Sequence, residues 1–295
     1  RAGDDSPRVR FQVALALVNW GQDPRRIDAL ARIARRDARD PWALSAVLAA
    51  VGTDAPSLLS ALLDSSRPLE ISPTVPLWHD LGAMIAAMRR QSLIEDVLGR
   101  LETIDRTTPD LRPFVTAVLL GLVENLAARP SLAGGPAISA RGRTLLDRLV
   151  GASSTVVNDQ NSPVEQRIRA IRLISAGDPR RAREMLVDLI DPRQPSEVQI
   201  AAARGLASTR AADVAQVLLG RFKAGSAALR GEIIELLTSR VEWIPPLLSA
   251  VETNEVGVND IPLARRGLLL RHPTESIKVK ALAVFGRERG GGRQD

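Results

Sequence analysis

Residues 195–203, PSEVQIAAA, are the stretch of sequence that decides the fold. Proline is favoured at the start of a helix, and the apolar residues that follow it recur at the three- and four-residue steps of one helix face. The stretch ends in three alanines. Because small side chains let helices approach closely, it predicts a helix packed against others of its kind.

The same opening recurs along the chain, which indicates a repeat architecture. It occurs as SPRVRFQVAL at 6–15, DPWALSAVL at 40–48, SPVEQRIRAI at 162–171 and TESIKVKAL at 274–282. The spacing is 34 residues between the first two stretches and 33 between the third and 195–203, enough for one helix pair. Asp23-Pro24 and Asp178-Pro179 predict the starts of second helices, and prolines at 56, 195 and 273 predict further helix starts.

This pattern resembles HEAT repeats. It predicts an all-α, right-handed α-solenoid of about seven or eight antiparallel helix pairs, in which stacking builds the core. We expect a single domain over residues 1–295, with a less regular middle at 69–140 and a polar Gly-rich tail at 289–295. Within and after that middle, helical periodicity continues at 78–90, 92–104, 112–128 and 140–149, whereas 130–136 and 154–160 have loop composition.

The composition excludes several chemistries. The 295 residues are 45% hydrophobic and 25% charged, as in a folded soluble protein, and no apolar run approaches the roughly 20 residues of a membrane span. There is no cysteine and there are only two histidines, which excludes thiol catalysis, disulfides, Cys-type metal sites and covalent haem attachment. The chain begins at Arg1 without a signal peptide, and we expect both ends to be cuts within a larger protein.

Several polar groups have residue types that could carry chemistry, and we favour a structural role for each. His79-Asp80, at a predicted helix start beside Trp78, could form part of a catalytic relay, but no nucleophile motif accompanies it. His272 precedes Pro273 in a predicted turn. The remaining candidates are two acidic pairs suited to metal or acid–base chemistry, Glu232/Glu235 and Asp188/Asp191; two expected helix caps, Asp105 and Asp110; and two Gly-rich segments, Gly134-Gly135-Pro136 and Gly290-Gly291-Gly292.

Arginines flank both acidic pairs at helical distance, so we expect salt-bridged surface there. The Gly-rich segments follow no strand and contain no phosphate-binding lysine, so we assign them no nucleotide. We expect no catalytic residue, cofactor site or metal site in this chain.

The net charge of +6 and the excess of arginine over lysine leave polyanion binding as the alternative function. Three clusters are candidate anion sites: Arg35-Arg36-Arg39, Arg180-Arg181-Arg183 and Arg265-Arg266-Arg271. Nucleic acid would also need exposed aromatic side chains, and only Trp20, Trp42, Trp78 and Trp243 are at hand. Trp20 and Trp42 lie on apolar stripes, so we expect them in the core. We favour an ordinary solvated surface, with its arginine content set by genome composition, over nucleic-acid binding.

The order of segments in the second half resembles a narrower family. The segments are Leu145–Leu149, Arg167–Ile174, Pro195–Leu206, Val214–Leu219, Arg240–Trp243, Leu247–Val251 and Leu268–Pro273, and 8–17 also fits. They resemble the HEAT-repeat region of a family of planctomycete multidomain proteins, the membrane-bound dehydrogenase or haem-binding Cys-x-x-Cys-His proteins. In that family a dehydrogenase-like β-propeller precedes the HEAT region and a cytochrome c domain follows it.

The resemblance implies a non-catalytic scaffold that docks the neighbouring propeller and cytochrome c domains or another protein, in a periplasmic or extracytoplasmic location, without membrane insertion. It carries over no functional residue, since the family's haem ligands and propeller site have no counterpart here.

Overall fold

The computed structural model describes residues 1–21, 23–64, 69–128 and 138–286, and every regular element in these ranges is a helix. The all-α class is therefore confirmed. The chain divides into two compact units, Arg1–Leu149 and Val150–Asp295. A single solenoid domain over the whole chain stays a prediction. The predicted loop at 130–136, with Gly134-Gly135-Pro136, and the Gly-rich tail lie outside the described residues.

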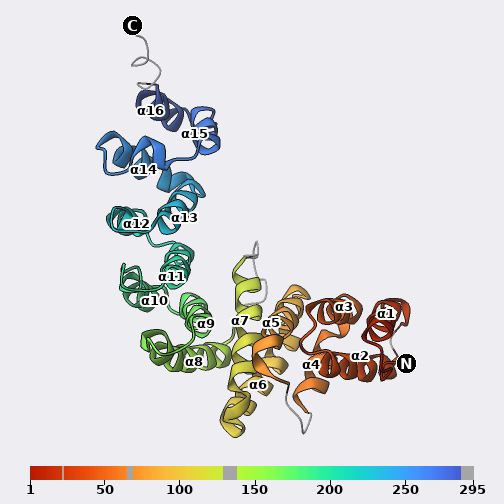
Figure 1. Ribbon diagram of the computed structural model, residues 1–295. Coiled ribbons are helices and arrows are strands. Elements are labelled where there is room, and N and C mark those ends of the chain that lie inside the picture. Colours follow the sequence, from red (N-terminus) through yellow and green to blue (C-terminus); the bar gives the residue numbers. More distant parts are fainter. Residues whose placement is uncertain (22, 65–68, 129–137, 287–295) are drawn as a thin grey trace. The chain divides into compact units, whose positions relative to one another are not determined.

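Unit 1 is built from two layers of helices (Figure 1). One layer contains α1 (Pro7–Ala16), α3 (Pro41–Val51), α5 (Ile71–Ala87) and α7 (Arg112–Ala128), and the other contains α2 (Pro24–Arg36), α4 (Ala55–Leu63) and α6 (Gln91–Thr107). The short helices η1 (Leu17–Asn19), η2 (Gly52–Asp54) and η3 (Pro109–Leu111) precede α2, α4 and α7. In the first layer each helix contacts the one two places on, and α2 contacts both α3 and α4.

Unit 2 repeats this arrangement. Its helices are α9 (Val164–Ser175), α10 (Pro179–Val187), α11 (Ser196–Ser208), α12 (Val214–Phe222), α13 (Ala227–Thr238), η4 (Val241–Trp243), α14 (Ile244–Glu252), η5 (Val258–Asp260), α15 (Leu263–Leu270) and α16 (Glu275–Phe285); α8 (Ala140–Asn158) spans the boundary between the units. Helices α9, α11 and α13 contact in order, as do α12, α14 and α16. Contacts between helices two places apart are consistent with an α-solenoid (Figure 1).

Polar side chains cap the helix starts and connect successive helix pairs. The carboxylates of Asp23 and Asp178 accept hydrogen bonds from the first backbone N–H groups of α2 and α10, as predicted. Five other side chains reach back to the carbonyl oxygen five residues before them: Arg10, Arg143, Gln199, Arg230 and Arg266, at 2.7–3.4 Å. These bonds satisfy backbone carbonyls just outside each helix start.

Two of these arginines, and Arg167 as well, also contact residues of the next helix pair. Arg10 is 5% exposed and bonds to Asp37, and Arg230 lies 3.8 Å from Asp260. Arg167 is 2% exposed and donates to Gln194 at 2.6 Å and to the Val157 carbonyl at 3.0 Å. Asp37, Asp260 and Gln194 each lie within four residues before the next helix of the same layer. A part of the arginine content therefore has a structural use, which composition alone did not suggest.

Two glycines set the closest helix contact in unit 1, between α5 and α7. A Cβ atom at Gly82 would stand 2.1 Å from the Val118 carbonyl oxygen, and one at Gly121 would stand 1.9 Å from that of His79. No other residue type fits either position at this separation. The expectation that small residues allow close approach is met most fully here.

The structure corrects three sequence assignments. Helix α5 starts at Ile71 rather than at residue 78, because Pro76 is accommodated inside it. Residues 154–158, predicted as loop, belong to α8: Val157 is 1% exposed, and the Ser154 hydroxyl bonds within the helix to the Gly151 carbonyl. Helix α16 stacks on α14, so the stretch 274–282 is not a counterpart of 195–203. That counterpart is α15, where Pro262 and Arg266 match Pro195 and Gln199.

Candidate docking surfaces

His79 is a cross-link between two helices. Its Nδ1 lies 3.0 Å from Oδ1 of the neighbouring Asp80, and its Nε2 lies 2.9 Å from Glu124 Oε2 of α7. It lies inside α5 rather than at its start. The contact falls beside the Gly121 crossing and holds α5 to α7. Glu124, which is 45 residues away in sequence, carried no signal that would have connected it to His79.

Glu232 and Glu235 share α13 but point to different neighbours. The Glu232 carboxylate accepts hydrogen bonds of 2.7 and 2.8 Å from the Arg204 guanidinium of α11, and Glu235 forms an ion pair with Arg265 of α15. The predicted salt-bridged surface is therefore present. The partners come from adjacent helices 28 and 30 residues away, not from the same helix.

The pair Asp188/Asp191 does not share a helix face. Helix α10 ends at Val187, and Asp191 lies in the following turn. There its carboxylate receives the Arg193 guanidinium and the Arg193 backbone N–H, which together hold the pKa of Asp191 at about 2. His272 lies in a turn, as predicted, and its Nδ1 accepts from the Thr274 N–H.

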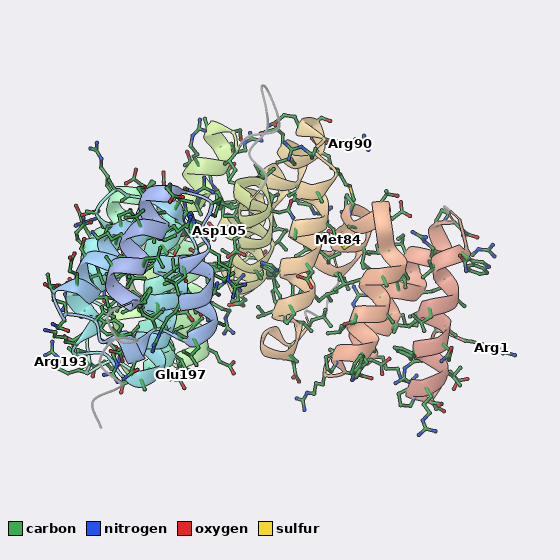
Figure 2. All side chains as sticks on the ribbon, turned by 90° about the horizontal axis from the view of Figure 1, so that it is seen from above. Arg1, Met84, Arg90, Asp105, Arg193 and Glu197 are labelled. Carbon is green, nitrogen blue, oxygen red and sulfur yellow. The ribbon has the colours of Figure 1, made fainter. Side chains whose placement is uncertain are left out.

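Asp105 (labelled in Figure 2) is a buried anchor inside α6 rather than a helix cap. It is 1% exposed and accepts hydrogen bonds of 2.7 Å from both Arg112 and Arg148. Glu102, one turn earlier, contacts Arg148 at 3.7 Å and also Arg106 and Arg141. A buried carboxylate needs such compensation. Asp110, the other expected cap, lies in η3.

The Arg35-Arg36-Arg39 cluster lines a surface hollow of about 1240 Å³ between α1, α2 and α4. Arg36 forms an ion pair with Asp5, Arg39 forms one with Glu70, and Arg35 donates a hydrogen bond to the Ala61 carbonyl. The hollow also contains Asp28, Asp37 and Asp40. Its guanidinium groups are thus balanced by carboxylates, which does not favour binding of a polyanion there.

Two tryptophans expected in the core are exposed. Trp20 is 54% exposed and lies 5.9 Å from the Arg25 guanidinium, and Trp42, in the first turn of α3, is 75% exposed. Each lies at the end of its apolar stripe, where a helix start or end faces away from the layer. Trp78 and Trp243 are buried.

Helix α16 has apolar residues on both sides. Ile277, Ala281 and Phe285 are buried against α14 and α15. The outward side carries Val279 at 56% and Leu282 at 50% exposure, followed by the exposed Ala283 and Gly286. We call these four outward residues the α16 stripe. Leu282, Ala283 and Gly286 lie three, four and seven residues after Val279, which is the spacing of a helix-packing face.

Among the described residues, no group of three or more His, Asp or Glu side chains could hold a metal ion. One described stretch, Pro41–Leu63, is long and apolar enough to cross a membrane, a feature missed in the sequence. The structure divides it into α3 and α4 at Gly52, which has φ +52°. Both helices pack within unit 1, a setting that also accounts for apolar composition.

No protein-family model matches this chain, and no curated protein shows significant similarity to it.

Proposed function

We propose that this chain is a non-catalytic scaffold that docks neighbouring protein domains through apolar faces on its terminal helices. One observation carries the proposal. Of the nine large apolar side chains that are exposed in the described residues, eight lie in residues 15–42 or 263–282. They are Leu15, Val18, Trp20, Trp42, Leu263, Leu268, Val279 and Leu282.

Exposed apolar clusters of this kind mark interaction surfaces. In a repeat stack each helix pair covers the apolar face of the previous one, and terminal pairs normally have polar outer faces. Helix α14 is contacted by α12 on one side and by α16 on the other. The α16 stripe has no such cover among the described residues, and a helix with apolar residues on both sides is typical of a buried position.

The N-terminal end of unit 1 offers a second apolar face. Beside Trp20 lies a hollow of about 530 Å³ whose walls include Ala2, Val13, Ala16 and Leu17. A cavity of this size and lining suits one or two apolar side chains of a partner.

We further propose that the stack is a right-handed, HEAT-like α-solenoid, and that it spaces a dehydrogenase-like β-propeller from a cytochrome c domain in a planctomycete-type multidomain protein. The repeated openings and the segment order of the second half support this. An extracytoplasmic location belongs to the same proposal.

The test is photo-crosslinking in the cells that make the protein, with p-benzoylphenylalanine at position 282. We expect one dominant product, joined to an apolar helix of another domain, that disappears with Val279→Glu while the circular dichroism spectrum is unchanged. Asn254, in an exposed turn of unit 2, is the control position. The proposal fails if position 282 gives no product, or gives the same products as position 254.

A further inference from the structure

The turns of unit 2 form two groups of opposite charge. Turns within a helix pair, α9–α10, α11–α12, α13–α14 and α15–α16, meet at one end of the helices, because helices two places apart run side by side. Turns between pairs meet at the other end. Figure 2 shows Arg193, in the α10–α11 turn of this second group, and Glu197, in the first turn of α11, at the same edge of unit 2.

The edge formed by the turns within pairs carries arginines at regular intervals. Arg180, Arg210, Arg240 and Arg271 are separated by 30, 30 and 31 residues, and Arg181 lies beside the first. We call these five residues the arginine row. The opposite edge is acidic, with Asp159, Asp188, Asp191, Glu255 and Asp260 against Arg193, Arg221 and Lys223.

Most of the arginine row is available for a partner. The side chains of Arg180, Arg181, Arg210 and Arg271 are exposed and form no ion pair among the described residues. The acidic groups of this edge are already engaged. Asp178 caps α10, Asp213 pairs with Arg183, Glu242 lies 3.8 Å from Arg240, and Glu275 lies 3.2 Å from Lys278.

Two local features favour a role for the arginines beyond solubility. Arg210 has φ +57°, a left-handed conformation that is costly for a residue with a Cβ and is usually filled by glycine or asparagine. Backbone strain retained at an exposed side chain points to a use for that side chain. Arg240 lies 4.8 Å from the ring centre of the buried Trp243, which holds its guanidinium in place at the edge.

We propose that the arginine row binds an extended acidic segment of a partner protein. Arg210, Arg240 and Arg271 follow the C-terminal ends of α11, α13 and α15, which belong to one layer. Neighbouring helices in a layer lie about 10 Å apart, so these three residues present one guanidinium about every 10 Å. An extended peptide rises about 3.3 Å per residue, so a carboxylate at every third residue meets successive arginines.

The same geometry disfavours nucleic acid. The only tryptophan of unit 2, Trp243, is 3% exposed, so the edge has no indole ring on which bases can stack. The carboxylates of Asp178, Asp213 and Glu242 also lie at this edge, each within three residues of an arginine of the row. They would repel a continuous phosphate backbone, while a peptide can place neutral residues opposite them.

The probe is a fluorescent twelve-residue peptide, (Glu-Gly-Ser)4, with (Gln-Gly-Ser)4 as its neutral control, titrated into the full chain at low salt. We expect saturable binding of the acidic peptide alone. The variant Arg180→Gln/Arg210→Gly/Arg271→Gln should lose about tenfold in affinity, the combined value of three exposed charge pairs. Because glycine tolerates the left-handed backbone, Arg210→Gly alone should weaken binding without lowering the melting temperature.

A matched variant, Arg193→Gln/Arg221→Gln/Lys223→Gln, removes the same charge from the opposite end of unit 2. It should change the affinity by less than about twofold, because screening confines the effect of a distant charge. An equal loss in this variant, or no binding of the acidic peptide, overturns the proposal. So does tighter binding of a twelve-nucleotide oligothymidine that is lost in the arginine-row variant, since it would assign the row to nucleic acid.

Discussion

Gly121 of α7 lies directly against the backbone of His79 in α5, so closely that a Cβ atom at residue 121 would stand 1.9 Å from the His79 carbonyl oxygen. Carbonyl oxygens cannot move aside as a side-chain end can. The two helices therefore meet backbone to backbone, and the imidazole of the same histidine bridges to Glu124 one turn further along α7.

Gly121→Ala should destabilise unit 1 by about 3 kcal/mol, because the new methyl group forces the helices apart. Urea unfolding followed by circular dichroism measures this. Gly231→Ala in α13 is the control: no heavy atom lies within 4 Å of its Cβ position, so it should stabilise its helix by about 0.5–1 kcal/mol. Equal effects of the two substitutions would contradict the close crossing.

Asp105→Ala should cost about 2 kcal/mol, because it removes the buried acceptor of two charged hydrogen bonds. The same unfolding experiment applies. Asp110→Ala, five residues on and exposed, should stay within about 0.5 kcal/mol of the parent. An unchanged free energy of unfolding in Asp105→Ala would show that water hydrates Arg112 and Arg148 as favourably as the carboxylate binds them.

A double-mutant cycle between Arg204 and Glu232 should give a coupling energy of about 0.5 kcal/mol at low salt that falls as salt is raised, since Arg204 is largely solvent-exposed. Glutamine replacements preserve packing while removing charge. A coupling energy of zero at low salt would show that the ion pair between Arg204 and Glu232 contributes nothing to the stacking of α11 on α13.

The Asp191 carboxyl should titrate at about pH 2 in the folded chain, because Arg193 donates to it from both side chain and backbone. Its folded pKa lies below the ordinary 3.8, so its contribution favours the folded state above pH 3.8 and is lost as the pH falls through 2. Carbon-13 NMR of the carboxyl carbon checks this. Arg193→Ala should leave an intermediate pKa, since the backbone N–H remains; an unchanged value would contradict the assigned cause.

The helical class could be read from the sequence because its signals are local. Proline after aspartate marked the starts of α2, α3 and α10, where the carboxylate caps the first backbone amides. Local signals also misled. The serines near residue 154 resemble a loop, yet the Ser154 hydroxyl bonds within α8, and Trp42 lies on an apolar stripe but in a first turn that faces outward.

The polar surface could not be predicted in the same way, because its partners come from different helices. Arg167 with Gln194 and Arg10 with Asp37 are each 27 residues apart, a separation that becomes a contact only when successive pairs stack. The sequence indicated that Glu232 and Glu235 are paired with arginine, but not which arginines. Asp105 and Asp110 flank a turn, which favours caps, and the partner Arg148, 43 residues from Asp105, gives no local signal of burial.

The most direct test of the docking role uses the absence of cysteine from the chain. A single Leu282→Cys substitution places one thiol on the α16 stripe, and maleimide labelling reports its exposure. We predict rapid labelling in the purified chain and strong protection in the native polypeptide within the cells that make it. Asn254→Cys, in an exposed turn, should label in both settings, and Leu247→Cys, fully buried, in neither. Equal labelling of Leu282→Cys in the purified chain and in cells would contradict the proposal that this face is a docking surface.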